Sequence, residues 1–428
     1  MLSRRKITGD LLVLLTGGLL ALAPAGCSVS GVAGRLTWDR KPVLDHSPRF
    51  PAGGWERPQR AVLEGFLHAY QPCVIEMDDS EYPYRMWFFG WIVDPTNPEY
   101  PGCDAIYHAR SRDLDRWEVL CKDGSWSGDR PEDWASTLFA STDGDRHYYH
   151  AWHVGDPSVV FRDGVYYMAF SSTSKPLDGP LAGYPSGMML CVMGATSVDG
   201  VHWHKREEPL LIAQCDSVFP PRAAAARVGD FHRPTLMWDE QQQAWKLYFD
   251  YYNASLPGNC HMGLAECRGD FRTGRFDFVH SLDEPLLDNW PNPEVVKIGT
   301  GYYCFSDPPG YAPADKTPGR FEGWDSRQLR TAFSADGRHW EKGEFIPPDP
   351  GIAACQVPQT FVCRRDGKWW LYLFADRPPG QRPSVRMVPR RGVQLVLRPD
   401  PLYAARDQMT ETPGERFVNP SAGFRMKN

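Results

Sequence analysis

Five short apolar runs in the sequence begin at a proline, and a polar residue usually stands immediately before it. The residues before the five prolines are Gln71, Asp156, Arg233, Asn292 and Val357, the last of them between Gln356 and Gln359. Carboxylate, amide and guanidinium groups pair with hydroxyls, while aromatic rings offer flat apolar faces for stacking. If the chain brings these groups into one depression, the chemistry they favour is carbohydrate recognition.

More polar and aromatic residues fall close to these five points, at the ends of neighbouring runs and in the connections. The residues that we expect to bind substrate are Gln71, Trp152, His153, His232, Arg233, Asp250, Asn292, Gln356 and Asp376. The ring-rich connection 122–155 is either a binding platform or a lid packed on the fold. The spacing of the polar residues does not predict a metal site, although a metal ion at the centre of such a depression is possible in principle. No cofactor is expected.

A repeated hairpin must position these residues. Each proline starts a strand that is followed by a turn and an aromatic-rich strand, and the turn Asp163-Gly164 is a strong hairpin signal. The second strands are predicted at 84–89, 166–170, 245–249, 302–305 and 369–373. Antiparallel order then places the residues before the prolines, the ends of the second strands and the connections between units on one rim.

A second repeated motif completes each unit. The segments 197–203 and 334–340 both read Ser-x-Asp-Gly-x-x-Trp, and 111–117 is a looser copy. Each unit therefore has four antiparallel strands, and radial repetition of such sheets makes a propeller. We predict an all-β, five-bladed β-propeller of four-stranded antiparallel blades, in preference to a two-sheet sandwich. The fifth unit lacks its own closing strand, so an N-terminal strand at 36–44 is expected to close the ring, with 392–397 as the alternative.

The first residues predict export. Arg4 and Arg5 precede an apolar stretch too short to remain in a membrane, as in a twin-arginine signal. Ala25-Gly26-Cys27 resembles a lipobox, although Pro24 also suits ordinary cleavage, so the only expected link to a membrane is a lipid on Cys27. The predicted divisions are an export signal at 1–27, the propeller at 28–398 and a C-terminal extension at 399–428. The expected location is periplasmic, or that of an outer-membrane or cell-surface lipoprotein.

The amino-acid composition of the chain limits the kinds of molecule that it is expected to bind. The chain has 428 residues, 13% aromatic residues and a formal net charge of −6 with interspersed signs, so nucleic acid is not an expected partner. Apart from Cys27, ten of the 11 cysteines remain. Cys73, Cys191, Cys304 and Cys363 lie in predicted strands, which favours buried apolar roles, while disulfides among the others stay open.

Three of these features resemble a known group of enzymes: the Asp156-Pro157 start, the strand Tyr166-Tyr167-Met168 and the Asp-Gly-x-x-Trp turn. They are similar to the five-bladed propeller glycoside hydrolases, which include arabinanase/xylosidase, invertase/levansucrase and mannoside-phosphorylase families. The resemblance covers residues 34–398 as architecture. It implies cleavage of a glycosidic bond by three acidic residues on separate inner strands.

Only Asp156 matches that acidic set directly. Gln71 stands where the resemblance implies a base, Arg233 replaces another acid, and Glu294 lies two residues beyond its expected position. Since glycoside cleavage needs one ionised and one protonated carboxyl group, we assign Asp156 as base or nucleophile and Glu294 as acid, with Asp307 in reserve. The competing interpretations are a turn role for Asp156 and a simple ion pair for Glu294.

The function predicted from the sequence is therefore that of an exported glycoside hydrolase. Two alternatives remain at this point. The chain could be a glycoside phosphorylase, in which His153, His232 and Arg233 would bind phosphate instead of orienting hydroxyls. It could also be a glycan-binding propeller that kept the funnel and lost catalysis.

Overall fold

The computed structural model describes residues 62–63, 68–78, 81–91, 104–139, 153–173, 190–212, 228–257, 260–298, 300–307, 329–343, 354–365, 369–376 and 393–398. All statements below concern these ranges. They contain β-strands, and the helical segment among them is the single 3-10 turn Pro131–Asp133. No helix in this part of the chain is long and apolar enough to cross a membrane. The predicted all-β class is confirmed.

The strands form five separate antiparallel sheets. The first sheet contains β1 (His68–Glu76), β2 (Tyr84–Trp91), β3 (Asp104–Ser111), β4 (Trp117–Leu120), β5 (Trp126–Ser127) and β6 (Ser136–Phe139). The second contains β7 (His153–Arg162), β8 (Val165–Thr173), β9 (Leu190–Ser197) and β10 (His204–Lys205). The third contains β11 (Val228–Asp239), β12 (Ala244–Asn253), β13 (His261–Cys267) and β14 (Asp277–Phe278). The fourth contains β15 (Glu294–Ile298), β16 (Gly301–Ser306), β17 (Arg330–Ser334) and β18 (Glu341–Lys342), and the fifth β19 (Ala354–Val362), β20 (Trp369–Asp376) and β21 (Val393–Arg398).

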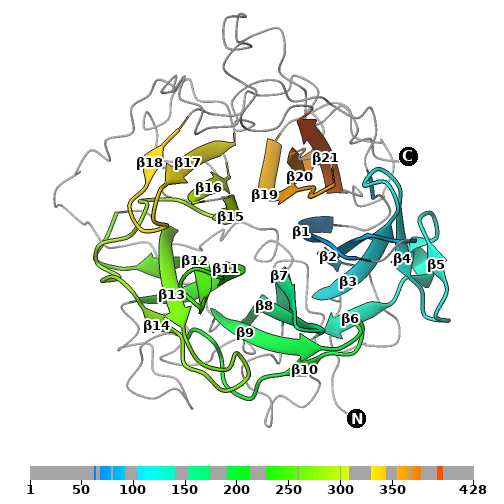
Figure 1. The fold of residues 1–428 in the computed structure, drawn as a ribbon, viewed down its shortest axis with the longest axis horizontal. Coiled ribbons are helices and arrows are strands. Elements are labelled where there is room, and N and C mark those ends of the chain that lie inside the picture. The colour runs from blue at the N-terminus through cyan, green and yellow to red at the C-terminus, as the bar shows by residue number, and fades with distance from the viewer. Residues whose placement is uncertain are drawn as a thin grey trace, which may run out of the picture.

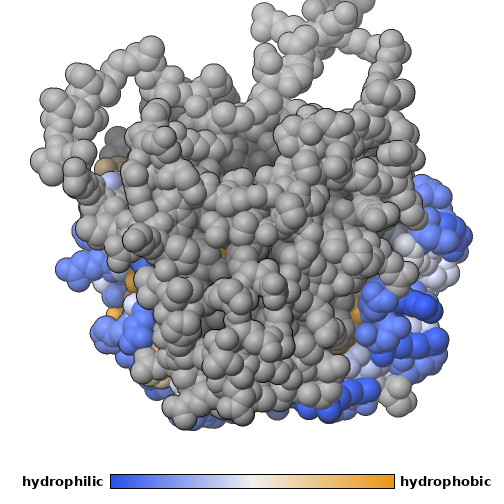
Figure 2. Space-filling model, turned by 90° about the horizontal axis from the view of Figure 1, so that it is seen from above, coloured by the Kyte–Doolittle hydropathy of each residue, from blue (hydrophilic) through white to orange (hydrophobic). Residues whose placement is uncertain are grey.

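The sheets are arranged as in a propeller, with β1, β7, β11, β15 and β19 nearest the centre (Figure 1). Apolar cores lie between successive sheets, because each sheet must bury a face against its neighbour. Trp87 and Met168 belong to the core between the first and second sheets, and Phe361 joins the last sheet to the first. The described surface visible in Figure 2 is mostly hydrophilic. The apolar side chains therefore hold neighbouring sheets together.

All five predicted hairpins form, and the residue before the proline has the same unusual backbone in four of them. Gln71, Asp156, Arg233 and Asn292 have φ angles of 48°, 50°, 50° and 49°. This left-handed conformation is uncommon for residues other than glycine, and it accompanies register shifts in β1, β7 and β11 at these positions. Strained residues of this kind are concentrated at functional sites. The repeated proline therefore marks a repeated bend in the inner strand.

A ring of contacts joins the five inner strands two residues beyond each bend. The residues at this position are Cys73, Ser158, Thr235, Glu294 and Gln359, and all are buried. Gln359 accepts from the Val74 amide at 3.2 Å and donates to Glu294 at 3.1 Å. The remaining contacts run from Thr235 to Glu294 at 3.2 Å, from the Leu236 amide to Ser158 at 2.9 Å and from the Val159 amide to Cys73 at 3.1 Å. Hydrogen bonds thus connect each inner strand to the next around the centre.

The Ser-x-Asp-Gly-x-x-Trp motif forms the turn between third and fourth strands and docks on the preceding sheet. The Trp87 indole N–H donates to the Gly200 carbonyl at 2.9 Å, and the Tyr248 hydroxyl donates to the Gly337 carbonyl at 3.0 Å. Both glycines have left-handed φ angles, 76° and 77°. A Cβ atom on Gly337 would lie 2.5 Å from the Tyr248 hydroxyl oxygen. Glycine is required here both by the backbone and by the close approach.

The sheets differ from the prediction in strand number. The second, third and fourth sheets have the expected four strands, whereas the first has six and the last has three described strands. Segment 393–398, the alternative closing strand, pairs with β20. The predicted strand 36–44, the export signal 1–27 and the extension 399–428 lie outside the described residues. The number of blades in the whole chain and the closure of the ring therefore stay predictions.

Seven cysteines have described side chains, and all seven are buried. They include Cys73, Cys191, Cys304 and Cys363, for which buried apolar roles were predicted, and burial raises the pKa of the Cys73 thiol to about 12. No disulfide occurs among these seven residues. Buried thiols of this kind are unreactive and act as small apolar side chains.

The buried His108 should make the stability of the folded protein depend on pH in the acidic range. Its ring stacks on Trp87 at 4.5 Å, and neither ring nitrogen has a hydrogen-bond partner among the described residues. Burial, assisted by the charge of Arg85, lowers the pKa of His108 from 6.5 to about 3. Between these values the unfolded chain binds a proton that the folded chain does not, so stability falls as the pH is lowered through this window.

We expect His108→Phe, which keeps the stacking, to reduce this acid sensitivity. From pH 7 to pH 5 the wild type should lose about 2 kcal/mol more than the variant. Urea unfolding at both pH values measures this difference. An equal loss in the two proteins would contradict it, and His204→Phe on the exposed β10 serves as control.

Candidate functional site

The structure brings most of the predicted site residues to the end of the inner strands that carries the bends. The residues with described, buried side chains are Gln71, Asp156, His232, Arg233, Asp250, Asn292, Glu294 and Asp307. His153, Gln356 and Asp376 belong to β7, β19 and β20, for which the backbone is described at these positions. Trp152 lies outside the described ranges.

Asp250 is the centre of the densest group of contacts. It lies on β12, its side chain is fully buried, and one carboxylate oxygen lies in contact with Nδ1 of His232. The other oxygen accepts from the Arg233 guanidinium at 3.1 Å and from the Asn292 backbone amide at 2.8 Å. Burial alone would raise the pKa of Asp250, but the charges of His232 and Arg233 lower it below its ordinary value. Asp250 is thus a buried carboxylate that joins the third and fourth sheets.

Asp307 directly follows β16 and lies beside the bend of the same sheet. The Asn292 side-chain amide donates to the Asp307 carboxylate. The Arg330 guanidinium donates to the Asp307 carbonyl oxygen at 2.5 Å and to the Asn289 carbonyl oxygen at 2.6 Å. The end of a second strand and a residue before a proline therefore meet, as antiparallel order predicted.

Glu294 belongs to the ring of contacts between inner strands. Its Oε1 accepts from the Gln359 amide at 3.1 Å, and its Oε2 is 3.2 Å from the Thr235 hydroxyl. Both carboxyl oxygens contact side chains of neighbouring sheets, which is a connecting role.

Several buried polar atoms of residues at or next to the bends have no hydrogen-bond partner among the described residues. They include Oε1 of Gln71, both ring nitrogens of His232 and Oδ1 of Asn292. The exposed fractions of these residues are 5%, 5% and 1%. Buried polar atoms are nearly always satisfied in folded proteins, so an unsatisfied set calls for an explanation. A polar ligand that enters between the bends would supply the missing partners.

Sequence reasoning missed Arg330 and Thr235, and it named Gln359 only as a neighbour of Val357. A signal for two of them was present. Thr235 and Gln359 occupy the same place in their repeats as Ser158 and Glu294, two residues beyond the one before the proline. Aligning the five repeats would have shown this polar column. Arg330 begins a third strand and carries no comparable signal.

The described part of the connection 122–155 packs on the first sheet. Trp134 is buried in the first core and donates its indole N–H to the Ser127 carbonyl at 2.8 Å. Trp126 contacts the edge of His108 and lies under the Arg110 guanidinium. For these two rings the interpretation as a segment packed on the fold holds.

No group of three metal-ligating side chains occurs in the ranges that the structure describes.

A shallow groove at the opposite ends of β1 and β7 contains none of the predicted site residues. Its lining includes Glu76, Arg162 and Arg364. Glu76 accepts from the Arg364 backbone amide at 2.6 Å and from the Arg365 guanidinium at 3.2 Å. This groove therefore borders the contact between the first and last sheets and is not the site proposed from the sequence.

Comparison with known proteins identifies the fold of this chain. No protein-family model matches the chain, and the search of curated proteins found no match. Among solved structures, one described only as a glycoside hydrolase aligns with a TM-score of 0.51 and 15% identity, over 87% of this chain and 96% of that one. The α-L-arabinofuranosidase from Lactobacillus brevis aligns with a TM-score of 0.50 and 8% identity, over 80% and 94%.

A third structure is Zg3597, a family 117 glycoside hydrolase from the marine bacterium Zobellia galactanivorans. It aligns with a TM-score of 0.50 and 13% identity, over 82% of this chain and 90% of that one. The chain spans only 53% and 58% of two longer structures that it also matches. At these identities the similarity concerns the fold alone. The chain has the propeller fold of these glycoside hydrolases, as the sequence resemblance predicted.

Proposed function

We propose that this chain is a carbohydrate-active enzyme that hydrolyses a glycosidic bond at the bends of its inner strands. The observation that carries the proposal is the set of unsatisfied buried atoms of Gln71, His232 and Asn292, together with the buried Asp156 at the equivalent bend of β7. Amide and imidazole groups that lack partners suit a ligand with many hydroxyls. The shared fold with glycoside hydrolases supports the same substrate class.

In this proposal Asp156 is the carboxylate that acts as base or nucleophile. The acid expected from the sequence is Glu294, with Asp307 in reserve. Arg233, Asp250 and Asn292 would hold substrate or the groups that contact it. His153, Gln356, Asp376 and Trp152 remain expected contributors to binding.

The wider architecture is proposed on the same basis. Five sheets and the ring of contacts between their inner strands support five blades. Closure by 36–44 would add the strand that the last sheet lacks among the described residues. Export through the signal at 1–27, with a lipid on Cys27 as the only membrane link, completes the proposal.

A glycan panel tests the activity. Purified protein should release reducing sugar from at least one plant or algal polysaccharide, or chromophore from a 4-nitrophenyl glycoside. Turnover that requires phosphate would indicate a phosphorylase instead. Binding of a glycan without turnover would indicate the non-catalytic propeller, an alternative favoured by the amides Gln71 and Asn292 at two bends.

A further inference from the structure

The backbone amides of two bends are bound by side chains of the preceding sheet. The Arg233 amide donates to the Ser171 hydroxyl oxygen at 2.7 Å, and the Asn292 amide donates to the Asp250 carboxylate at 2.8 Å. Ser171 lies on β8 of the second sheet and Asp250 on β12 of the third. Both acceptors are buried, with exposed fractions of 3% and 0%. Ser171 was not among the site residues predicted from the sequence.

Ser171 and Asp250 occupy the same position in their repeats. In each hairpin this position lies two residues after the one that pairs with the ring of contacts between inner strands. The residues found at this position in the five sheets are Phe89, Ser171, Asp250, Asp307 and Phe374. Three consecutive sheets thus offer a side-chain acceptor here, whereas a phenylalanine side chain cannot accept from an amide in this way.

The bends need such acceptors because their amides lie outside the paired positions of their own sheets. The paired positions of β11 pass from His232 to Thr235, and those of β15 begin at Glu294. A buried amide without an acceptor is costly, so the amides of Arg233 and Asn292 require a partner from elsewhere. The left-handed φ angles of 50° and 49° also persist only where the surroundings hold them. The acceptor on the preceding sheet meets both requirements.

These contacts continue as one chain of hydrogen bonds across three sheets. The Arg233 guanidinium donates at 3.1 Å to the same Asp250 oxygen that accepts from the Asn292 amide. The Asn292 side-chain nitrogen donates to the Asp307 carboxylate. Because both nitrogens of Asn292 are bound, its side-chain oxygen is held in one orientation. That oxygen is buried and has no hydrogen-bond partner among the described residues.

We propose that Ser171 is a positioning residue that fixes the bend at Arg233, as Asp250 fixes the bend at Asn292. The inference rests on the proposed function, in which the side chains of Arg233 and Asn292 hold the sugar. Ser171 acts in it only through the Arg233 backbone. Groups that are held in their binding geometry before the ligand arrives bind it more tightly. Loss of the acceptor should therefore weaken substrate binding and leave the chemical step nearly unchanged.

The variant Ser171→Ala removes the acceptor. On a glycoside that the wild type hydrolyses, KM should rise about tenfold and kcat should change less than about threefold. A merely structural role would reduce the amount of folded enzyme, which lowers the measured kcat and leaves KM unchanged. Ser171→Thr restores a hydroxyl and should return KM to within about threefold of the wild type. In an Arg233→Ala background, Ser171→Ala should change KM less than about twofold, because the side chain that it positions is absent.

Ser172→Ala is the matched control. Ser172 is also buried on β8, with an exposed fraction of 1%, but alternation places its side chain on the opposite face of the strand. This variant should leave KM unchanged. The inference is overturned if Ser171→Ala leaves KM unchanged, or if the two alanine variants raise it equally.

Hydrogen–deuterium exchange tests the inference independently of activity. In Ser171→Ala the Arg233 amide should exchange at least about tenfold faster than in the wild type, while the amides of β13 in the same sheet should be unaffected. Unchanged exchange at Arg233 would overturn the inference even in an active enzyme. A wild type that hydrolyses no glycoside would overturn the proposed function instead, and the exchange rate of the Arg233 amide would still decide whether Ser171 holds the bend.

Discussion

Asp156→Asn should reduce the rate of glycoside hydrolysis about 10²- to 10⁴-fold while leaving the fold intact, as expected for loss of a base. Asp156 is buried and has a φ angle of 50°. Asparagine has nearly the same shape and tolerates this left-handed conformation well. The substitution therefore removes the negative charge with little change in backbone strain. The measurement is kcat/KM on whichever glycoside the wild type hydrolyses, together with a thermal unfolding curve.

Asp163→Asn is the matched control for this prediction. Asp163 lies in the turn of the same hairpin, has a φ angle of 52° and is exposed, with its carboxylate 2.8 Å from Arg162. Exposed ion pairs contribute little, so stability should change by less than about 1 kcal/mol and activity should be unchanged. A fully active Asp156→Asn protein would refute the role of Asp156. A large loss of activity in both variants would indicate a general effect on the hairpin.

The hairpins could be predicted from the sequence because the local turn and strand signals favour the same structure as the packing of the sheets. Asp163-Gly164 adopts the left-handed φ angles of 52° and 78° that a tight hairpin turn requires. Aromatic and β-branched residues on either side favour strands. The motif glycines Gly200 and Gly337 could be recognised for the same reason, since a left-handed turn leaves little choice of residue.

The bends of the inner strands and the contacts around them could not be predicted from local sequence signals. Glutamine and arginine have no preference for left-handed φ, and a following proline normally favours an extended residue. The values at Gln71 and Arg233 are therefore set by the surrounding sheets. The pair His232 and Asp250 depends on two register shifts between β11 and β12, which change which residues face each other. The contact of Glu294 with Gln359 could not be predicted because the two residues are 65 positions apart in the sequence.

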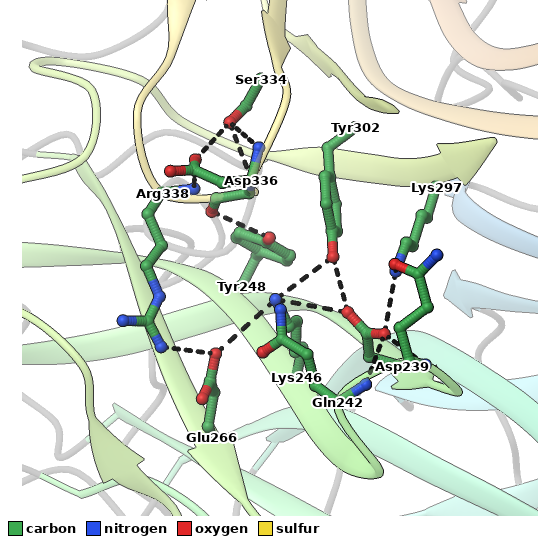
Figure 3. A network of polar contacts seen from close by, with 12 residues as sticks. Asp239, Gln242, Lys246, Tyr248, Glu266, Lys297, Tyr302, Ser334, Asp336 and Arg338 are labelled. Carbon is green, nitrogen blue, oxygen red and sulfur yellow. Dashed lines mark hydrogen bonds and ion pairs between the residues drawn. The ribbon is translucent and has the colours of Figure 1, made fainter. Parts of the chain in front are cut away.

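A buried ionic network between the third and fourth sheets should dominate the effect of single substitutions on stability (Figure 3). Asp239 is fully buried, accepts from the Tyr302 hydroxyl at 2.6 Å and from Lys297 at 2.8 Å, and lies 3.4 Å from Lys246. Lys246 is also fully buried, 3.6 Å from Glu266. Burial opposes ionisation of Asp239, but these donors lower its pKa below the ordinary value. The stabilisation is therefore present above about pH 4 and is lost as the pH falls further.

Asp239→Asn should lower the free energy of unfolding by about 3–5 kcal/mol, since it leaves the buried Lys246 and the part-buried Lys297 with too little negative charge nearby. Urea unfolding at pH 7 measures this loss. Asp277→Asn is the control, because the ion pair of Asp277 with Arg275 at 2.6 Å is exposed and should contribute less than about 1 kcal/mol. Equal losses in the two variants would show that the buried network does not hold these sheets together. Because Asp239 lies at the hairpin end of β11, away from the bends, the folded variant should keep the specific activity of the wild type. That result would separate the residues that join the sheets from those proposed to act on a sugar.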